Sequence, residues 1–476
     1  MAWYAFRDDP PAPEEAVSFR MQQGQEVGEL ACKLYPDGVL VPSFNIERAA
    51  QITNQYIAHG HETIFEASVA AGPLAARADI LTRVSDGWHV LEVKSNFSDK
   101  PGISSLVDDL AYTVMVFRRS GLRVSQASLV LLSRQYRFGD SPERLFDVVD
   151  KTADAMTRAD EFAAEADSTA RVIFHDEPPA PQLSCACRVC STFVDARRGA
   201  KGVPTVLEIP SLHFKKLQRL SAEGIVAISE IPDDLELNDR QSRAVRSAVS
   251  GQMIVEEGLE GALTEFIWPC HYLDFETVAT VLPLYQGHGC HEQVLTQFSI
   301  HHRDRIDSEV RHSEYLADAG RECQRELAEA LIRALGQNGS VVVYSSFERT
   351  RIKGLRKLFP DLSEQLQAIL DRFVDLFTIL ADHAYHPDFR GRFSIKTVLP
   401  ALLPDLSYAG LAIRDGDMAI TRFARMARGE VGGDEAEATR RQLLDYCEMD
   451  TLAMVRLHEK LVELASIEEL VKRASD

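Results

Sequence analysis

The sequence predicts a mixed α/β protein with more than one domain, and three observations indicate this. The chain has 476 residues, more than the roughly 100–200 residues of an ordinary domain. Residues 63–133 and residues 265–465 each alternate strand-like and helix-like patterns, which is typical of α/β folds. Hydrophobic residues make up 45% and charged residues 26% of the chain, as in ordered globular proteins.

The apolar patterns place the elements in order. In the first stretch we expect strands at 63–67, 78–84 and 88–94, a helix at 106–119, a strand at 127–133 and a helix at 146–166. In the second we expect strands at 267–275, 294–301 and 340–344, and helices at 321–335, 362–372 and 439–465. We therefore expect a first domain at 1–200, a helical connector at 201–264 and a second domain at 265–476.

Charge and hydropathy limit the classes of protein. The net charge of −20 argues against a basic surface for nonspecific nucleic-acid binding. It still allows a metal-dependent nuclease, because bound cations reverse the field around clustered carboxylates. No apolar run is long enough for a membrane span, and no secretory signal pattern opens the chain. We expect a cytoplasmic protein without a membrane partner.

The first group of candidate catalytic residues is Asp79, Glu92 and Lys94. Asp79 lies near the start of one strand, and Glu92 and Lys94 share a face of the next strand. The hairpin turn at residues 85–87 would bring the three together. Two metal-binding carboxylates beside a lysine suit phosphodiester hydrolysis, in which negative charge develops on the phosphate oxygens. A cross-strand surface salt bridge is the alternative.

The second group begins with Asp274 and Glu276, which point to the same face of a strand. Glu348 follows another strand, and Tyr446 and Asp450 lie four residues apart on one face of a helix. The four carboxylates could hold two Mg or Mn ions, with Tyr446 positioning a water. The alternative is a polar strand face that meets solvent.

Three cysteines, Cys185, Cys187 and Cys190, fall within six residues. Thiolates this close favour a shared metal ion or an iron-sulfur cluster. Incidental clustering and a redox-active pair are the alternatives. The other five cysteines are scattered, as expected of reduced thiols.

The segments ARADIL at residues 76–81 and LEVKS at 91–95 resemble the PD-(D/E)XK nuclease superfamily, particularly its RecB-like and CRISPR adaptation-nuclease branch. The resemblance covers about residues 15–195. It implies a restriction-endonuclease-like domain with Asp79 and Glu92 as metal ligands and Lys94 as a catalytic residue. It also implies a further ligand on the preceding helix, for which Glu29 or Glu26 is the candidate. Where the branch often carries a glutamine, this chain reads LAYT at residues 110–113.

The same branch implies a role for the cysteines. Several of its members bind a four-iron four-sulfur cluster through one cysteine before the nuclease fold and three after it. Cys32 is the candidate for the early ligand, and Cys185, Cys187 and Cys190 are the candidates for the later three. Zinc remains the alternative occupant.

Residues 265–470 resemble the DEDD exonucleases of the ribonuclease H-like fold, in the subclass whose last motif is Y-x-x-x-D. This resemblance implies a catalytic role for Asp274, Glu276, Glu348, Tyr446 and Asp450, with Glu348 standing where aspartate is usual. Asp375 fits a supporting position or a helix cap. His386 and Lys396 are possible substrate-facing residues.

Both halves in this order resemble an uncharacterised bacterial family known as a domain of unknown function. The expected function is metal-dependent, exonucleolytic hydrolysis of nucleic acid at two candidate sites, with DNA favoured over RNA. Two alternatives are kept. One is a nucleic-acid-binding or scaffold protein built from nuclease folds that have lost catalysis, and the other is a cluster-based redox sensor.

Overall fold

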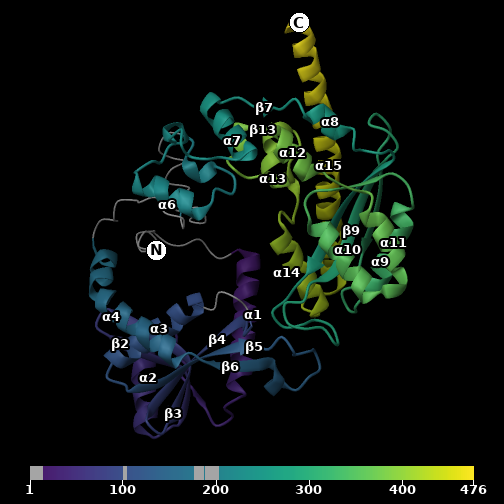
Figure 1. Ribbon diagram of the computed structural model, residues 1–476. Coiled ribbons are helices and arrows are strands. Elements are labelled where there is room, and N and C mark those ends of the chain that lie inside the picture. Colours follow the sequence, from purple (N-terminus) through teal and green to yellow (C-terminus); the bar gives the residue numbers. More distant parts are fainter. Residues whose placement is uncertain (1–13, 100–103, 176–186, 188–202, 476) are drawn as a thin grey trace. The chain divides into compact units, whose positions relative to one another are not determined.

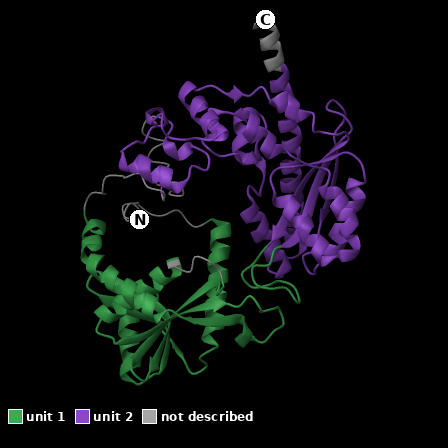
Figure 2. Cartoon of the chain, viewed as in Figure 1, with its two compact units in different colours: residues 1–179, 279–293 green, residues 180–278, 294–476 purple. Residues whose placement is uncertain are grey.

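The computed structural model describes residues 14–99, 104–175, 187 and 203–475 (Figure 1). The chain forms two compact units, one of residues 1–179 with 279–293 and the other of residues 180–278 with 294–476 (Figure 2). Each unit has its own mixed sheet covered by helices, so the expected α/β class is confirmed. Among the described helices, none combines the length and the apolar character that a membrane crossing requires.

The sheet of unit 1 has six strands that neighbour one another in chain order. The β1–β2 and β4–β5 pairs are parallel and the other pairs are antiparallel. The strands are β1 (Val39–Leu40), β2 (Thr63–Ala71), β3 (Leu74–Val84), β4 (Gly87–Phe97), β5 (Val124–Leu132) and β6 (Phe146–Asp150). The helices are α1 (Glu15–Cys32), α2 (Ile46–Ala58), α3 (Ser104–Arg119) and α4 (Thr152–Ile173).

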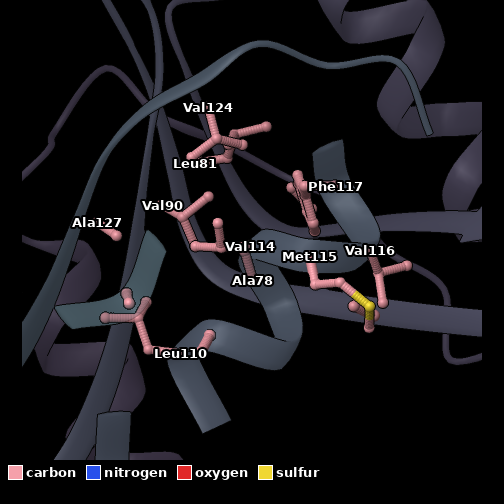
Figure 3. Packing of buried hydrophobic residues seen from close by; sticks show 14 of the residues in the cluster. Ala78, Leu81, Val90, Leu110, Val114, Met115, Val116, Phe117, Val124 and Ala127 are labelled. Carbon is pink, nitrogen blue, oxygen red and sulfur yellow. The ribbon is translucent and has the colours of Figure 1, made fainter. Parts of the chain in front are cut away.

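The main core of unit 1 lies between the sheet and helix α3. Leu81 and Val90 from the strands pack in one buried cluster with Leu110, Val114 and Phe117 from α3 (Figure 3). The three α3 residues recur at the spacing of one helix face. Burial of this face fixes α3 across the middle strands, where Asp79 and Glu92 are found.

The structure differs from the sequence prediction at residues 146–166, where a single helix was expected. Phe146–Asp150 is strand β6, which pairs antiparallel with β5, and helix α4 begins only at Thr152. The Asp150 carboxylate accepts hydrogen bonds from the Thr152 N–H and hydroxyl, at 2.8 and 2.7 Å. Asp150, the last residue of β6, thus binds the first residue of α4.

Residues 279–293 belong to unit 1 although they connect two strands of unit 2. The Val281 N–H donates to Gln23 Oε1 at 2.7 Å, and the Phe138 N–H donates to the His288 carbonyl at 2.8 Å. Cys290 is buried in a hydrophobic cluster with Phe65. This segment therefore completes the hydrophobic packing of unit 1.

The five-stranded sheet of unit 2 has the order β10-β9-β8-β11-β12. Strand β8 is antiparallel to β9 and parallel to β11, β10 is antiparallel to β9, and β12 is parallel to β11. The strands are β8 (Cys270–Val278), β9 (Val294–Arg303), β10 (Arg311–Leu316), β11 (Ser340–Val343) and β12 (Phe373–Asp375). A separate two-stranded sheet pairs β7 (Ile254–Val255) with β13 (Ala384–Tyr385).

Ten α-helices are described in unit 2. They are α6 (Phe214–Ala222), α7 (Asp239–Ser250), α8 (Leu259–Leu263), α9 (Gln324–Leu335), α10 (Phe347–Leu358), α11 (Ser363–Leu370), α12 (Leu376–His383), α13 (Ile395–Leu402), α14 (Gly416–Ala427) and α15 (Gly433–Ser475).

Strand β8 separates two hydrophobic cores. Tyr272 packs in one core with Met454 and Leu457 of α15, whereas Leu273 packs in the other with Leu327 of α9. Because successive strand residues alternate between faces, Asp274 and Glu276 share the α15 face with Tyr272.

Candidate active sites

Four carboxylates from three elements of unit 2 form the more complete site. Asp274 and Glu276 come from β8, Asp450 from α15, and Glu348 from the first turn of α10. Carboxylate oxygens of Asp274, Glu276 and Asp450 all lie within 4.8 Å of one another. The fold thus brings together residues that are 176 positions apart in the chain, 274 to 450.

The carboxylates of this site sit in an environment that disfavours their charge. Burial is the main cause that raises the pKa of Asp274 and Glu276, and the neighbouring carboxylates add to it. The pKa of Glu348 is raised well above its ordinary value by burial and by the charge of Asp274. Burial also raises the pKa of Asp450, although hydrogen bonds from Tyr408 and Tyr446 oppose this.

Glu348 provides the clearest sign that the site suits a cation. Its side chain is buried, and its Oε2 has no hydrogen-bond partner among the described residues. A buried carboxylate oxygen without a partner is costly unless a positive charge meets it. The donor set consists of carboxylate oxygens, which are the ligands that Mg²⁺ and Mn²⁺ prefer. One or two Mg²⁺ or Mn²⁺ ions therefore fit the site formed by Asp274, Glu276, Glu348 and Asp450.

Two tyrosines and a lysine complete this region. Lys396, in the first turn of α13, donates to Tyr446 Oη at 2.7 Å and to the Arg414 carbonyl at 2.8 Å. Its Nζ also lies 4.6 Å from the ring centre of Tyr446 and 5.2 Å from that of Tyr408. The Tyr408 hydroxyl donates to Asp450 Oδ1 at 2.5 Å. Lys396 is thus a positive charge held within the acidic group.

Several of these contacts were not expected from the sequence. Tyr408 was missed because it lies in a short 3-10 turn without a periodic pattern, 42 residues before its partner Asp450. Cys447 was treated as a scattered thiol, yet its Sγ lies 3.5 Å from Asp274 Oδ2. Its neighbours Tyr446 and Asp450 were the only signal that this turn of helix faces the site.

Asp375 acts as a helix cap, which was one of its two expected roles. Its Oδ1 accepts from the backbone N–H groups of Ser345 and Phe377, both at 3.0 Å, and its Oδ2 accepts from the Thr378 hydroxyl at 2.9 Å. It also adds to the field that raises the pKa of Glu348. His386 caps the turn at residues 387–389, where its Nδ1 accepts from the Asp388 N–H at 3.2 Å.

In unit 1 the structure brings Asp79, Glu92 and Lys94 together. Asp79 Oδ2 accepts from the Val93 N–H at 2.6 Å, and Lys94 Nζ lies 3.7 Å from Glu92 Oε2 and 3.2 Å from Asp109 Oδ2. Burial and the charge of Asp79 raise the pKa of Glu92 to about 8. Burial also raises the pKa of Asp79, with Lys94 acting in the opposite direction.

Two further residues of unit 1 join this group. Thr113 of α3 donates to Glu92 Oε1 at 2.9 Å, so this helix residue contacts the candidate site directly. Glu66 of β2 lies between the paired positions Phe65–Ile80 and Ala67–Ala78, and therefore opposite Asp79. Its φ of 56° interrupts the strand pairing there, and its pKa is raised by burial and by Asp79. Glu66 was not expected from the sequence, although its place on the adjacent strand could have suggested it.

Helix α1 carries the candidate early ligands, and the cysteine cluster is described only at Cys187. Glu29 and Cys32 both lie on α1, and the pKa of Cys32 is raised to about 11 by burial and by the charges of Glu66, Asp79 and Glu29. Cys187 is buried, whereas Cys185 and Cys190 lie outside the described residues. Glu26 accepts a hydrogen bond from Gln22 on the same helix, at 3.1 Å.

Comparisons with known proteins locate one family within the chain. Residues 271–394 match a family described as a domain of unknown function, DUF2779. The matched segment contains Asp274, Glu276 and Glu348 and ends before Tyr446 and Asp450. Searches of curated proteins and of solved structures found no match. The expected likeness to a domain of unknown function is therefore confirmed for this segment.

Proposed function

We propose that the protein is a metal-dependent nuclease that hydrolyses phosphodiester bonds, with its main active site at Asp274, Glu276, Glu348 and Asp450. The observation that carries this proposal is the convergence of Asp274, Glu276 and Asp450. Beside them, under the charge of Asp274, lies a buried Glu348 oxygen without a partner among the described residues. Their origin on a central strand, a helix start and a late helix agrees with the DEDD exonuclease resemblance. The resemblance favours attack at chain ends, and DNA is the favoured substrate.

Divalent cations bound by these carboxylates would lower the pKa of a water and neutralise charge on the phosphate. The Tyr446 side chain stays a neutral phenol, since burial and the charge of Asp450 raise its pKa. Lys396 donates to the Tyr446 oxygen, so the phenol proton faces an acceptor, which is Asp450 in this structure. We propose that Tyr446 orients the attacking water and that Lys396 offsets negative charge at the scissile phosphate.

The Asp79, Glu92 and Lys94 group supports a second nuclease site in unit 1. Glu92 is the member whose pKa is most clearly shifted, as is common at functional carboxylates. The ion pairs of Lys94 with Glu92 and Asp109 hold its charge beside the carboxylate pair. The PD-(D/E)XK resemblance supports a catalytic use of this arrangement.

The cysteines bear on the same proposal. An iron-sulfur cluster held by Cys185, Cys187 and Cys190 would stabilise the N-terminal domain, as the RecB-like resemblance implies. Zinc is the alternative. Metal and sulfide analysis of the purified protein distinguishes the two.

The test uses the full chain with end-labelled single- and double-stranded DNA and RNA, in Mg²⁺, in Mn²⁺ and in chelator. We expect metal-dependent shortening of linear single strands from one end, and no cleavage of covalently closed circles at this site. The double variant Asp274→Ala with Glu276→Ala should lower the rate by roughly 10³-fold or more, because it removes two metal ligands.

The matched control is Asp361→Ala with Glu364→Ala, two exposed acids of the same unit, which removes the same charge. The control should degrade linear DNA at the wild-type rate. Undiminished shortening by the Asp274 and Glu276 double variant would refute the proposed main site. Binding of nucleic acid without cleavage in either metal would favour the scaffold alternative. Cleavage of circles that is lost only in Glu92→Ala would assign that activity to unit 1.

A further inference from the structure

A second group of possible metal ligands in unit 2 lies outside the carboxylate site. His301 of β9, His312 of β10 and Glu448 of α15 each offer one ligand atom, and these atoms lie within 4.8 Å of one another. His301 and His312 are directly paired across the two strands, and their ring centres are 4.6 Å apart. His312 Nδ1 lies 3.7 Å from Glu448 Oε1.

A network of buried hydroxyl groups holds the two imidazole rings. Thr451 Oγ1 lies 2.8 Å from His301 Nδ1 and 2.8 Å from Ser299 Oγ. Ser299 Oγ in turn lies 2.8 Å from His312 Nε2. Ser299 and Thr451 are both fully buried, so water does not compete for these bonds.

The helix carbonyls beside Thr451 suggest a direction for each hydrogen bond. The Thr451 hydroxyl lies 3.0 Å from the Glu448 carbonyl and 3.4 Å from the Cys447 carbonyl, which can only accept, so we assign its one proton to them. With this assignment Thr451 accepts from Ser299 and from His301 Nδ1. Ser299, having donated to Thr451, accepts from His312 Nε2.

This assignment leaves His301 Nε2 and His312 Nδ1 as the unprotonated ring nitrogens. Metal-binding histidines characteristically donate their other ring N–H to a fixed acceptor, which sets the tautomer and the ring orientation. Here both rings are fixed in this way by Thr451 and Ser299. The network therefore prepares two nitrogen ligands beside one carboxylate.

We propose that His301, His312 and Glu448 bind a transition-metal dication, and that Zn²⁺ is the ion that this donor set fits best. Two imidazoles and one carboxylate match the ligand sets of zinc and related ions, whereas Mg²⁺ prefers oxygen ligands alone. The site differs from the carboxylate site in donor chemistry. The proposal does not depend on nuclease activity.

The bound ion would act as a structural link. Glu448 and Thr451 lie on a different face of α15 from Tyr446 and Asp450, since residues 448 and 450 are separated by roughly 200° around a helix. Strand β9 pairs with β8 so that Ser299 lies opposite Asp274. An ion at this place would tie the β9–β10 edge of the sheet to the helix that positions Asp450.

The test measures Zn²⁺ binding by calorimetry after removal of metals with chelator. Experiments use the full chain, with Asp274→Ala and Glu276→Ala present to remove the carboxylate site. His312→Gln and Glu448→Gln change partly exposed residues, so both should fold. We expect each to lose one Zn²⁺ equivalent or to bind it at least about tenfold more weakly. Asp445→Asn, an exposed acid one turn away on α15, is the matched control and should bind as the parent does.

Cobalt separates this site from the cysteines near residue 187. Thiolate ligands give a charge-transfer band with Co²⁺ that nitrogen and oxygen ligands do not give, so His312→Gln should lose only ligand-field absorption. In hydrogen exchange, Zn²⁺ should slow exchange in β10 and in residues 440–455 of the parent but not in the two variants. Equal Zn²⁺ stoichiometry and affinity in His312→Gln, Glu448→Gln and Asp445→Asn would overturn the proposal.

Discussion

Glu348 has a buried carboxylate oxygen, Oε2, that finds no hydrogen-bond partner among the described residues. Its raised pKa means that it is protonated in the folded protein at pH values where it is ionised in the unfolded chain. The folded state is therefore favoured at low pH, and this contribution is lost as pH rises towards the folded pKa. A divalent cation would replace the proton and restore the stability at neutral pH.

The raised pKa of Glu348 predicts the behaviour of the Glu348→Gln variant. In chelator at neutral pH, the variant should have a higher Tm than the wild type, because it removes the cost of burying a charge or taking up a proton and keeps the shape of the side chain. Mn²⁺ should raise the Tm of the wild type and should raise that of the variant much less. Differential scanning fluorimetry with and without Mn²⁺ measures both effects. A variant that is less stable than the wild type in chelator would contradict the account of Glu348.

Tyr446 allows a separate test of the proposed water-positioning group. We expect Tyr446→Phe to lower kcat by about 10²-fold, the usual scale for loss of a proton-transfer or orienting group. The Mn²⁺-dependent rise in Tm should persist, because the four carboxylates remain. Tyr315→Phe on β10 is the matched control. If Tyr446→Phe retains the wild-type kcat, Tyr446 has no role in positioning water.

Glu92 in unit 1 gives a prediction about pH. Its pKa of about 8, raised by burial and by Asp79, makes the folded protein lose stability as pH rises from about 5 to 8 in chelator. Glu92→Gln keeps the oxygen that accepts from Thr113 and removes this titration. The stability advantage of the variant should therefore grow across that pH range. Hydrogen exchange in residues 74–97 measures the stability of each protein at each pH. A stability difference between variant and wild type that stays constant with pH would refute the raised pKa of Glu92.

At the level of elements, the hairpin between β3 and β4 determines where Asp79 and Glu92 meet. Gly87 has a φ of 142°, and a Cβ there would lie 2.4 Å from the Arg123 carbonyl oxygen. Gly72 has a φ of 64° with open space around it. We expect Gly87→Ala to destabilise unit 1 by about 2–3 kcal/mol and Gly72→Ala by about 1 kcal/mol. Urea denaturation measures the free energy of unfolding of both variants. Equal losses of stability in the two variants would contradict the predicted role of Gly87.

Local patterns predicted the elements that carry the candidate sites, because strand and helix periodicities are properties of adjacent residues. The strands at 63–67 and 88–94 and the helix at 106–119 are observed, with ends that differ by several residues. The helix expected at 146–166 was wrong in its first turn, where Val148 and Val149 pair with β5. Pairing with a strand 14 or more residues earlier is not visible in a local pattern.

The contacts that complete the sites depend on the tertiary fold. Asp274, Glu276 and Asp450 were grouped from motif order, and the structure places them together. Tyr408 and the hydroxyl network of Ser299 and Thr451 could not be predicted, since their partners are far away in sequence. A sequence pattern identifies which residues carry chemistry, but the packing of α15 on the sheet determines what they touch.

At the scale of the whole molecule, each unit has a separate sheet and a separate group of carboxylates. Asp79 and Glu92 belong to unit 1, and Asp274, Glu276, Glu348 and Asp450 belong to unit 2. Because the two groups lie in separate compact units, we expect the effects of their variants on stability to add.

The insertion of residues 279–293 into unit 1 means that neither unit is a continuous stretch of chain. A polypeptide that ends at residue 179 lacks the backbone N–H of Val281 that binds Gln23, and it lacks the buried Cys290. We expect residues 1–179 to aggregate when expressed alone and to be rescued by co-expression of residues 203–476. The two pieces should then co-purify by fragment complementation, and a soluble, well-folded 1–179 would show that the insertion is dispensable.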